Sequence, residues 1–156
     1  MSEYDGAIDF KINIFGAHNN FNIPLKLRDK INMMQGLPYD EAILKMKEMD
    51  ANILIIPNNG RKGVYSGKLF DYISVQRPII ALIDKEDVAA DLINDFNCGY
   101  VSDFKDVHEV FESLKKLIKD KSEGVSKVAT HDQVLSIHRK NQVIKLKNVI
   151  NQLICK

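Results

Sequence analysis

The residues best suited to binding a ligand lie in one loop and in the start of the helix that comes after it. The loop contains two bases, Arg61 and Lys62, and the helix begins at Ser66-Gly67-Lys68. Ser66 is a typical N-cap residue, Gly67 lets a ligand approach the backbone, and Lys68 adds charge in the first turn. Because the first N–H groups of a helix lack helical partners and carry partial positive charge, this pattern predicts a phosphate or other anion site.

Asp71 follows one turn later on the same predicted helix. A carboxylate at this position complements the helix dipole, and it can also accept hydrogen bonds from a pair of sugar hydroxyls. A phosphate site beside a hydroxyl acceptor suits a nucleotide or a nucleotide-sugar. Many helices begin with a similar mix, so chemistry alone leaves both interpretations of Asp71 open.

Spacing excludes several better-known sites. A P-loop needs a glycine five residues before the glycine of the GK pair at 67–68 and a Ser or Thr after the lysine, but the chain has Lys62 and Leu69 there. No G-x-G-x-x-G comes after the first predicted strand, where the chain has GAH at 16–18. No G-x-S-x-G elbow occurs, and the four histidines show no partner pattern.

Composition predicts a single domain over residues 1–156. A net charge of +1 without an aromatic-interleaved basic patch argues against nucleic-acid binding. The two cysteines lack metal-ligand spacing, and Cys98 is expected to be a small buried apolar residue. The acidic N-terminus is unlike a signal peptide, and no apolar run is long enough to span a bilayer. We expect a cytoplasmic protein.

Apolar runs and helical periodicity alternate along residues 10–120, which predicts a doubly wound α/β domain with a parallel five-stranded sheet. The expected strands are Phe10–Phe15, Ile31–Met34, Ile53–Ile56, Ile79–Ile83 and Tyr100–Val101. The expected helices are Asp40–Met49, Ser66–Val75, Val88–Phe96 and Val107–Ile118, with a last amphipathic helix over 131–154.

The last predicted helix is basic, because the chain has five bases and no acid beyond Asp132. Such a helix suits a peripheral contact with an anionic membrane surface. The simpler interpretation, which we favour from the sequence, is a terminal helix docked on its own domain or on a neighbouring one with a solvated basic face.

The segment SGKLFDYISVQRPIIALI at 66–83 resembles a part of the GT-B glycosyltransferases of the group-1 class, in which a helix carries an acid before a small-residue turn and a Pro-led apolar strand. INMMQGLPYDEAILKMKEMDANILIIP at 31–57 is similar to the preceding strand, glycine, turn, helix and strand of that family. KINIFG at 11–16 resembles an earlier strand ending in glycine, and FNCGYV at 96–101 resembles the segment after the Pro-led strand. The resemblance covers roughly residues 10–120, in line with the doubly wound pattern.

Members of that family move a sugar from a nucleotide-sugar to an acceptor, using two Rossmann-like halves. This chain resembles only the C-terminal, donor-binding half of enzymes that build bacterial surface polysaccharides. The resemblance implies a nucleotide-sugar substrate and no cofactor. No metal is implied, because we expect no carboxylate pair near the loop at 57–66. By position it assigns the ribose-binding acid to Asp71 and the diphosphate region to Ser66, Gly67 and Lys68. It also assigns nucleotide-binding positions to Gly36 and Leu37, in the turn beside the base, and to Gly16, at the end of the earlier strand.

The chain also departs from the family pattern. A glutamate that contacts the donor sugar in many retaining members is replaced by Gly63. The first strand of this half has no counterpart before Phe10, and the acceptor-binding half is missing. We therefore expect a donor-binding chain that is inactive alone and acts with an N-terminal half or a second subunit, and we name no catalytic residue.

Without that central strand, the strands at 10–15 and 53–56 are free to pair directly. The sheet would then have the flavodoxin-like order 2-1-3-4-5. The alternative function is a non-catalytic flavodoxin-like module that binds a partner through its basic C-terminal helix.

Overall fold

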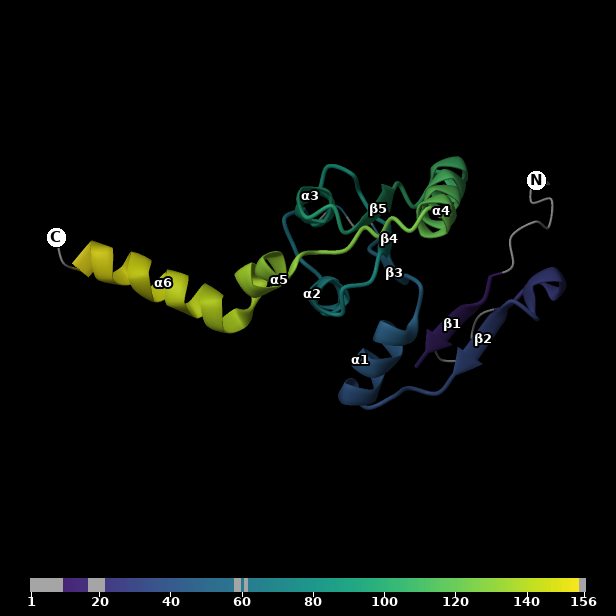
Figure 1. Ribbon diagram of the computed structural model, residues 1–156, viewed down its shortest axis with the longest axis horizontal. Helices are drawn as coiled ribbons and strands as arrows, with labels where there is room; N and C mark the ends of the chain where they lie inside the picture. Colours follow the sequence, from purple (N-terminus) through teal and green to yellow (C-terminus); the bar gives the residue numbers. More distant parts are fainter. Residues whose placement is uncertain (1–9, 17–21, 58–59, 61, 155–156) are drawn as a thin grey trace. The chain divides into compact units, whose positions relative to one another are not determined.

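The computed structural model describes residues 10–16, 22–57, 60 and 62–154. It is an α/β protein with parallel strands (Figure 1). The elements are β1 (Ile12–Phe15), η1 (Leu25–Leu27), β2 (Ile31–Met34), α1 (Tyr39–Glu48), β3 (Asn52–Ile55), α2 (Gly67–Ser74), β4 (Ile79–Leu82), α3 (Val88–Asp95), β5 (Gly99–Ser102), α4 (Val107–Ser122), α5 (His131–Ile137) and α6 (Arg139–Ile154).

The strands form two sheets, so the prediction of one five-stranded sheet is wrong. β1 pairs with β2, and β3, β4 and β5 form a separate sheet in that order. All these pairs are parallel, with Ile12 opposite Ile31 and Ile79 opposite Gly99. The order 2-1-3-4-5 required a β1–β3 pair, and the described residues form none. Apolar runs identify strands but carry no information on the partner of an edge strand, which is why the order could not be inferred from them.

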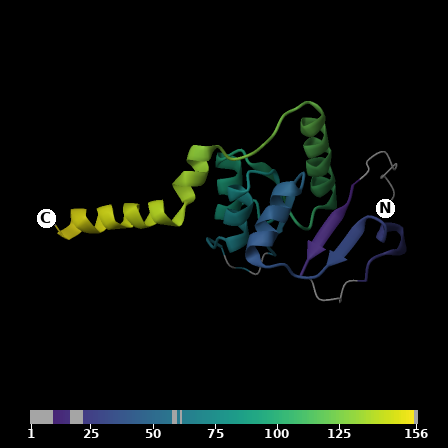
Figure 2. The same cartoon turned by 60° about the horizontal axis from the view of Figure 1, so that its bottom comes forward.

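The chain divides into two compact units, Met1–Ala42 and Ile43–Lys156. In the first unit, no residue of β1 or β2 is fully buried. In the second unit, α2 and α3 lie on one face of the β3–β4–β5 sheet and α4 lies on the other (Figures 1 and 2). The buried core of this unit comprises Leu54, Leu69, Ile73, Ile79, Ala81, Ile83, Ala89, Ala90, Ile93, Cys98 and Ala129.

Polar side chains fix the helices that surround this core. Asp106 caps α4 by accepting a hydrogen bond from the N–H of Glu109. Buried hydroxyls of Ser102 on β5 and Ser113 on α4 lie 2.7 Å apart. The Tyr100 hydroxyl donates to Asp120 Oδ2 at 2.6 Å, which gives α4 a second hydrogen-bonded link to the same strand. α4 is therefore held to β5 at two points along the helix.

The prediction of one continuous helix over 131–154 is wrong, because the helix is interrupted between α5 and α6. The chain is extended at His138, whose Nδ1 accepts a hydrogen bond from the N–H of Lys140. The side chains of Asn141 and Gln142 donate to the last carbonyls of α5, on Leu135 and Ser136. These bonds satisfy helix-end groups that a continuous helix would pair internally, which explains a break without Pro or Gly.

α5 is anchored to the core, whereas α6 has no buried residue. Thr130 and Gln133 form a capping box at the start of α5, and the Gln76 side chain donates to the carbonyl of Ala129. Val134 and Ile137 pack on the core from α5. No helix in the described part of the chain has both the length and the apolar character needed to cross a bilayer.

Cys98 is buried as predicted, with 1% of its surface exposed. Burial raises the pKa of its thiol to about 11, so the reactive thiolate is scarce at neutral pH. In a Cys155→Ser variant we expect Cys98 to resist a thiol reagent at pH 7.5 and to react fully in denaturant. Rapid reaction in the native protein, followed by absorbance, would contradict a buried Cys98.

Candidate functional site

The anion site predicted from the sequence falls at the N-terminus of α2. α2 follows β3 at the carboxyl edge of a parallel sheet, where ligands bind in α/β proteins. Ser66 occupies the N-cap position, as predicted, but its hydroxyl makes no capping hydrogen bond. Within the described residues, no acceptor is found for the N–H groups of Gly67 and Lys68. The helix start therefore has donors available for a bound anion.

The side chains around this helix start leave room for a ligand. No atom lies within 4 Å of a Cβ built on Gly67, and Lys68 is exposed. Lys68 forms no ion pair with any described acid. Asp71 is partly exposed and lies three residues after Lys68, which places both side chains on the same side of the helix. The structure brings together all four site residues predicted at the start of α2.

The other predicted site residues belong to the first unit. The backbone passes close to itself there, since a Cβ built on Gly16 would lie 3.4 Å from the Cα of Gly36. Gly16 has a φ of +73° and donates its N–H to the carbonyl of Met34. Leu37, the next residue after Gly36, is partly buried. Gly16 and Gly36 thus meet at the carboxyl ends of β1 and β2.

Lys62 is engaged by acids that sequence analysis missed. Its Nζ lies 3.2 Å from Glu86 Oε2 and 3.6 Å from Asp84 Oδ2. The hydrogen bond to Glu86 and the charge of Asp84 raise the pKa of Lys62. Arg61, the other base of the loop, lies outside the described residues. Of the two described lysines in this segment, Lys68 is therefore the better candidate to meet a ligand anion.

The same two acids show that the expectation of no carboxylate pair near the loop is wrong. Asp84 and Glu86 form a carboxylate pair near the loop, although none was expected there. Their signal in the sequence is their place directly after the β4 strand. Across the described ranges, no group of three or more His, Cys, Asp or Glu side chains is arranged to hold a metal ion.

A second ion pair lies at the same edge of the sheet, between Lys85 and Glu109 at 2.6 Å. The hydrogen bond from Lys85, followed by that from the N–H of Asp103, lowers the pKa of Glu109. Both partners are substantially exposed, so the pair contributes little to stability. It links the loop after β4 to the first turn of α4.

Asp87 joins the loop between β3 and α2 to α3. Its Oδ1 accepts hydrogen bonds from the N–H of Val88, as the N-cap of α3, and from the N–H of Gly63, both at 2.8 Å. Gly63, which stands where the sugar-contacting glutamate was expected, has a φ of +79°. A glutamate at this position would be strained, because side chains with a Cβ rarely adopt such backbone angles. The backbone conformation at position 63 therefore favours glycine over a residue with a side chain.

We expect Asp87→Ala to lower the free energy of unfolding by about 2 kcal/mol, because two N–H groups lose a buried acceptor. Asp106→Ala is the matched control, since Asp106 is exposed and caps only α4. It should cost about 1 kcal/mol. Urea unfolding measures both. Equal losses would show that the Gly63 contact adds no stability.

Tyr65 is an exposed aromatic residue beside the helix start that sequence analysis did not single out. It is 44% exposed, and its ring contacts Phe70 edge-on at 5.4 Å between centroids. Phe70 on α2 thereby steadies the Tyr65 ring near Ser66. The sequence feature that could have pointed to Tyr65 is its position directly before the predicted N-cap, Ser66. The ring offers a surface on which a nucleobase or a sugar can stack.

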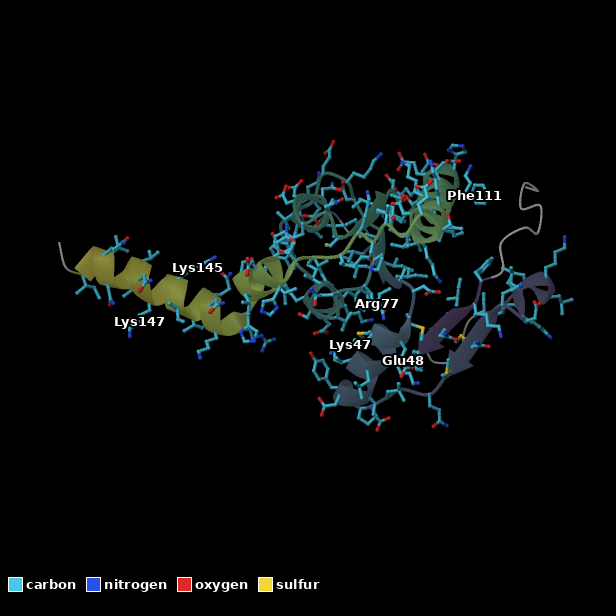
Figure 3. The ribbon with its side chains drawn as sticks, in the orientation of Figure 1. Lys47, Glu48, Arg77, Phe111, Lys145 and Lys147 are labelled. Atoms are coloured by element: carbon cyan, nitrogen blue, oxygen red, sulfur yellow. The ribbon has the colours of Figure 1, made fainter. Side chains whose placement is uncertain are left out.

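A separate hollow of about 200 Å³ lies at the opposite, amino-terminal edge of the sheet. It is lined by Asp50, Arg77, Pro78, Leu117, Lys121, Gly124, Val125 and Ser126. Lys121 is paired with Asp50 at 2.7 Å. Arg77 donates to the carbonyl of Lys47, and both residues are labelled in Figure 3. The C-terminal end of α4 also points its carbonyl groups toward this edge, which disfavours anions. This hollow suits the predicted phosphate less well than α2 does.

Comparison with known proteins identifies no relative, because no family model, no curated protein and no solved structure matches the chain.

Proposed function

We propose that the second unit binds the diphosphate of a nucleotide-sugar at the N-terminus of α2. The observation that carries this proposal is the helix start itself. The amides of Gly67 and Lys68 have no acceptor among the described residues, and the Ser66 hydroxyl is not used in capping. Together with the Lys68 ammonium they form a set of donors suited to phosphate oxygens.

The remaining groups of the site give the ligand its class. Asp71 lies one turn along α2 from the donors, and in this proposal its carboxylate accepts hydrogen bonds from ribose hydroxyls. Tyr65 supplies an exposed ring for stacking. An anion, a diol and a flat ring are the three parts that a nucleoside diphosphate presents. The resemblance to the donor-binding half of group-1 glycosyltransferases is the reason for proposing that the diphosphate carries a sugar.

In a glycosyl transfer reaction, this site would stabilise the leaving nucleoside diphosphate. Negative charge develops on the diphosphate as the bond to the sugar breaks, and fixed N–H groups and an ammonium favour that charge. Position 63 provides no acid, and the Gly63 backbone is tied to Asp87. We therefore propose a donor-binding part that acts with an acceptor-binding half or subunit, in the assembly of surface polysaccharides.

A thermal-shift screen tests donor binding directly. Uridine, guanosine and adenosine diphosphates and their sugars should be compared with the bare nucleosides and with inorganic phosphate. At a concentration about 100 times the Kd, one diphosphate should stabilise the protein by about 2.7 kcal/mol. For a chain of this size the Tm would rise by roughly 5–10 °C. No shift with any diphosphate would count against the proposal.

A further inference from the structure

The helix α6 presents an apolar stripe that nothing in the described structure covers. The stripe consists of Val143, Leu146, Val149, Ile150, Leu153 and Ile154, each between 44% and 76% exposed. These residues recur at three- and four-residue spacing, which places them along one side of a helix. Within the described chain, α6 has its close contacts with α5. A row of exposed aliphatic side chains indicates a surface that binds an apolar partner, either a protein or a membrane.

The charges on α6 narrow the choice of partner. The helix carries Arg139, Lys140, Lys145 and Lys147 and no acid. Lys147 lies one turn after Val143 and Lys145 one turn before Val149, so the two lysines border the stripe on either side. They leave the helix on opposite sides in Figure 3. A stripe bordered by bases on both sides is complementary to a partner whose apolar interior lies beneath an anionic surface layer.

We propose that α6 binds in the plane of an anionic phospholipid surface, with the stripe among the acyl chains and the lysines at the headgroups. Lysine side chains can bury their stems and extend their ammonium groups to lipid phosphates. A second copy of α6 is a poor partner, because two acid-free basic helices repel each other. The stripe also lacks Trp, Tyr and Arg, the residues that most often anchor protein–protein contacts.

Tryptophan fluorescence can test which side of α6 meets the lipid. The chain contains no Trp, so a single substitution gives the only signal. With vesicles of phosphatidylcholine and phosphatidylglycerol, emission from Ile150→Trp should move to shorter wavelength. Asn148→Trp, on the opposite side of the same helix, should show no such change. Equal responses, or none from Ile150→Trp, would overturn the proposal.

Vesicle co-sedimentation of the full chain tests the charge requirement. Each base near an anionic surface contributes about fivefold to affinity, so Lys145→Gln with Lys147→Gln should weaken binding roughly 25-fold. Lys116→Gln with Lys119→Gln removes the same charge from exposed positions on α4 and should change binding less than about threefold. High salt should weaken binding of the unmodified chain.

Three results of the sedimentation experiment would overturn the proposal. They are equal binding to vesicles of phosphatidylcholine alone, no binding to either vesicle, and the same loss in the α4 control. Self-association in solution that is lost in Ile150→Asp would likewise overturn it, since α6 would then serve as an interface between copies. Circular dichroism of each variant confirms that the fold is intact.

Discussion

Replacing Gly99 by alanine is expected to destabilise the second unit by about 3 kcal/mol. Gly99 opens β5 opposite Ile79 of β4, and a Cβ at this position would lie 2.3 Å from the Ile79 carbonyl oxygen and 2.9 Å from its Cβ. Both are closer than nonbonded atoms approach, and the obstacle is backbone rather than a flexible side chain. To relieve the clash, the two strands must separate.

Urea unfolding at 25 °C measures this effect, and Gly67→Ala is its matched control. Position 67 has open space around a built Cβ and lies in the first turn of α2, so alanine there should be neutral or stabilise by less than about 1 kcal/mol. For Gly99→Ala the Tm should fall by roughly 6–12 °C. A loss below about 1 kcal/mol would contradict the close β4–β5 packing at this point.

The second large effect concerns Lys68. We expect Lys68→Ala to weaken binding of a nucleoside diphosphate by roughly 10- to 100-fold, because a charge-assisted hydrogen bond to phosphate contributes about 1.5–3 kcal/mol. Lys62→Ala removes a charge from the same loop, yet Lys62 already pairs with Asp84 and Glu86. It should weaken binding less than about threefold. Titration calorimetry compares the two variants, and a larger loss in Lys62→Ala would reverse the assignment.

Asp71 can be tested through the ribose it is proposed to bind. The unmodified chain should prefer the ribonucleoside diphosphate over its 2′-deoxy form, because the 2′-hydroxyl donates to the carboxylate. Asp71→Ala should bind both forms equally. Unchanged discrimination in the variant would show that Asp71 serves only the helix dipole, which is the other interpretation of an acid in this position.

The sequence predicted the helices and strands better than it predicted the sheet. Buried strands such as β4 are runs of Ile, Ala and Leu, and the helix starts have residues suited to capping, so their positions follow from local pattern. Pairing of β1 is a tertiary property, and nothing in its four residues specifies the neighbour. The prediction of one continuous helix over 131–154 failed for a similar reason. Apolar periodicity continues past His138, but hydrogen bonds made by the residues that follow stabilise a break there.

The candidate site was also predicted in part. Ser66, Gly67, Lys68 and Asp71 are close in the sequence and at one helix start, so their proximity needed no knowledge of the fold. The engagement of Lys62 by Asp84 and Glu86 joins residues that are distant in the sequence and depends on β3 and β4 being neighbours. Asp87 likewise contacts Gly63 only because the β3–α2 and β4–α3 loops meet at one edge of the sheet.

The most direct test of the central claim observes the backbone amides of Gly67 and Lys68 by nuclear magnetic resonance during titration with a nucleoside diphosphate. If the α2 N-terminus holds the diphosphate, these two N–H resonances should show the largest shifts in the second unit, and Lys68→Ala should reduce them. Binding that moves other resonances while leaving these two unchanged would contradict a diphosphate site at α2.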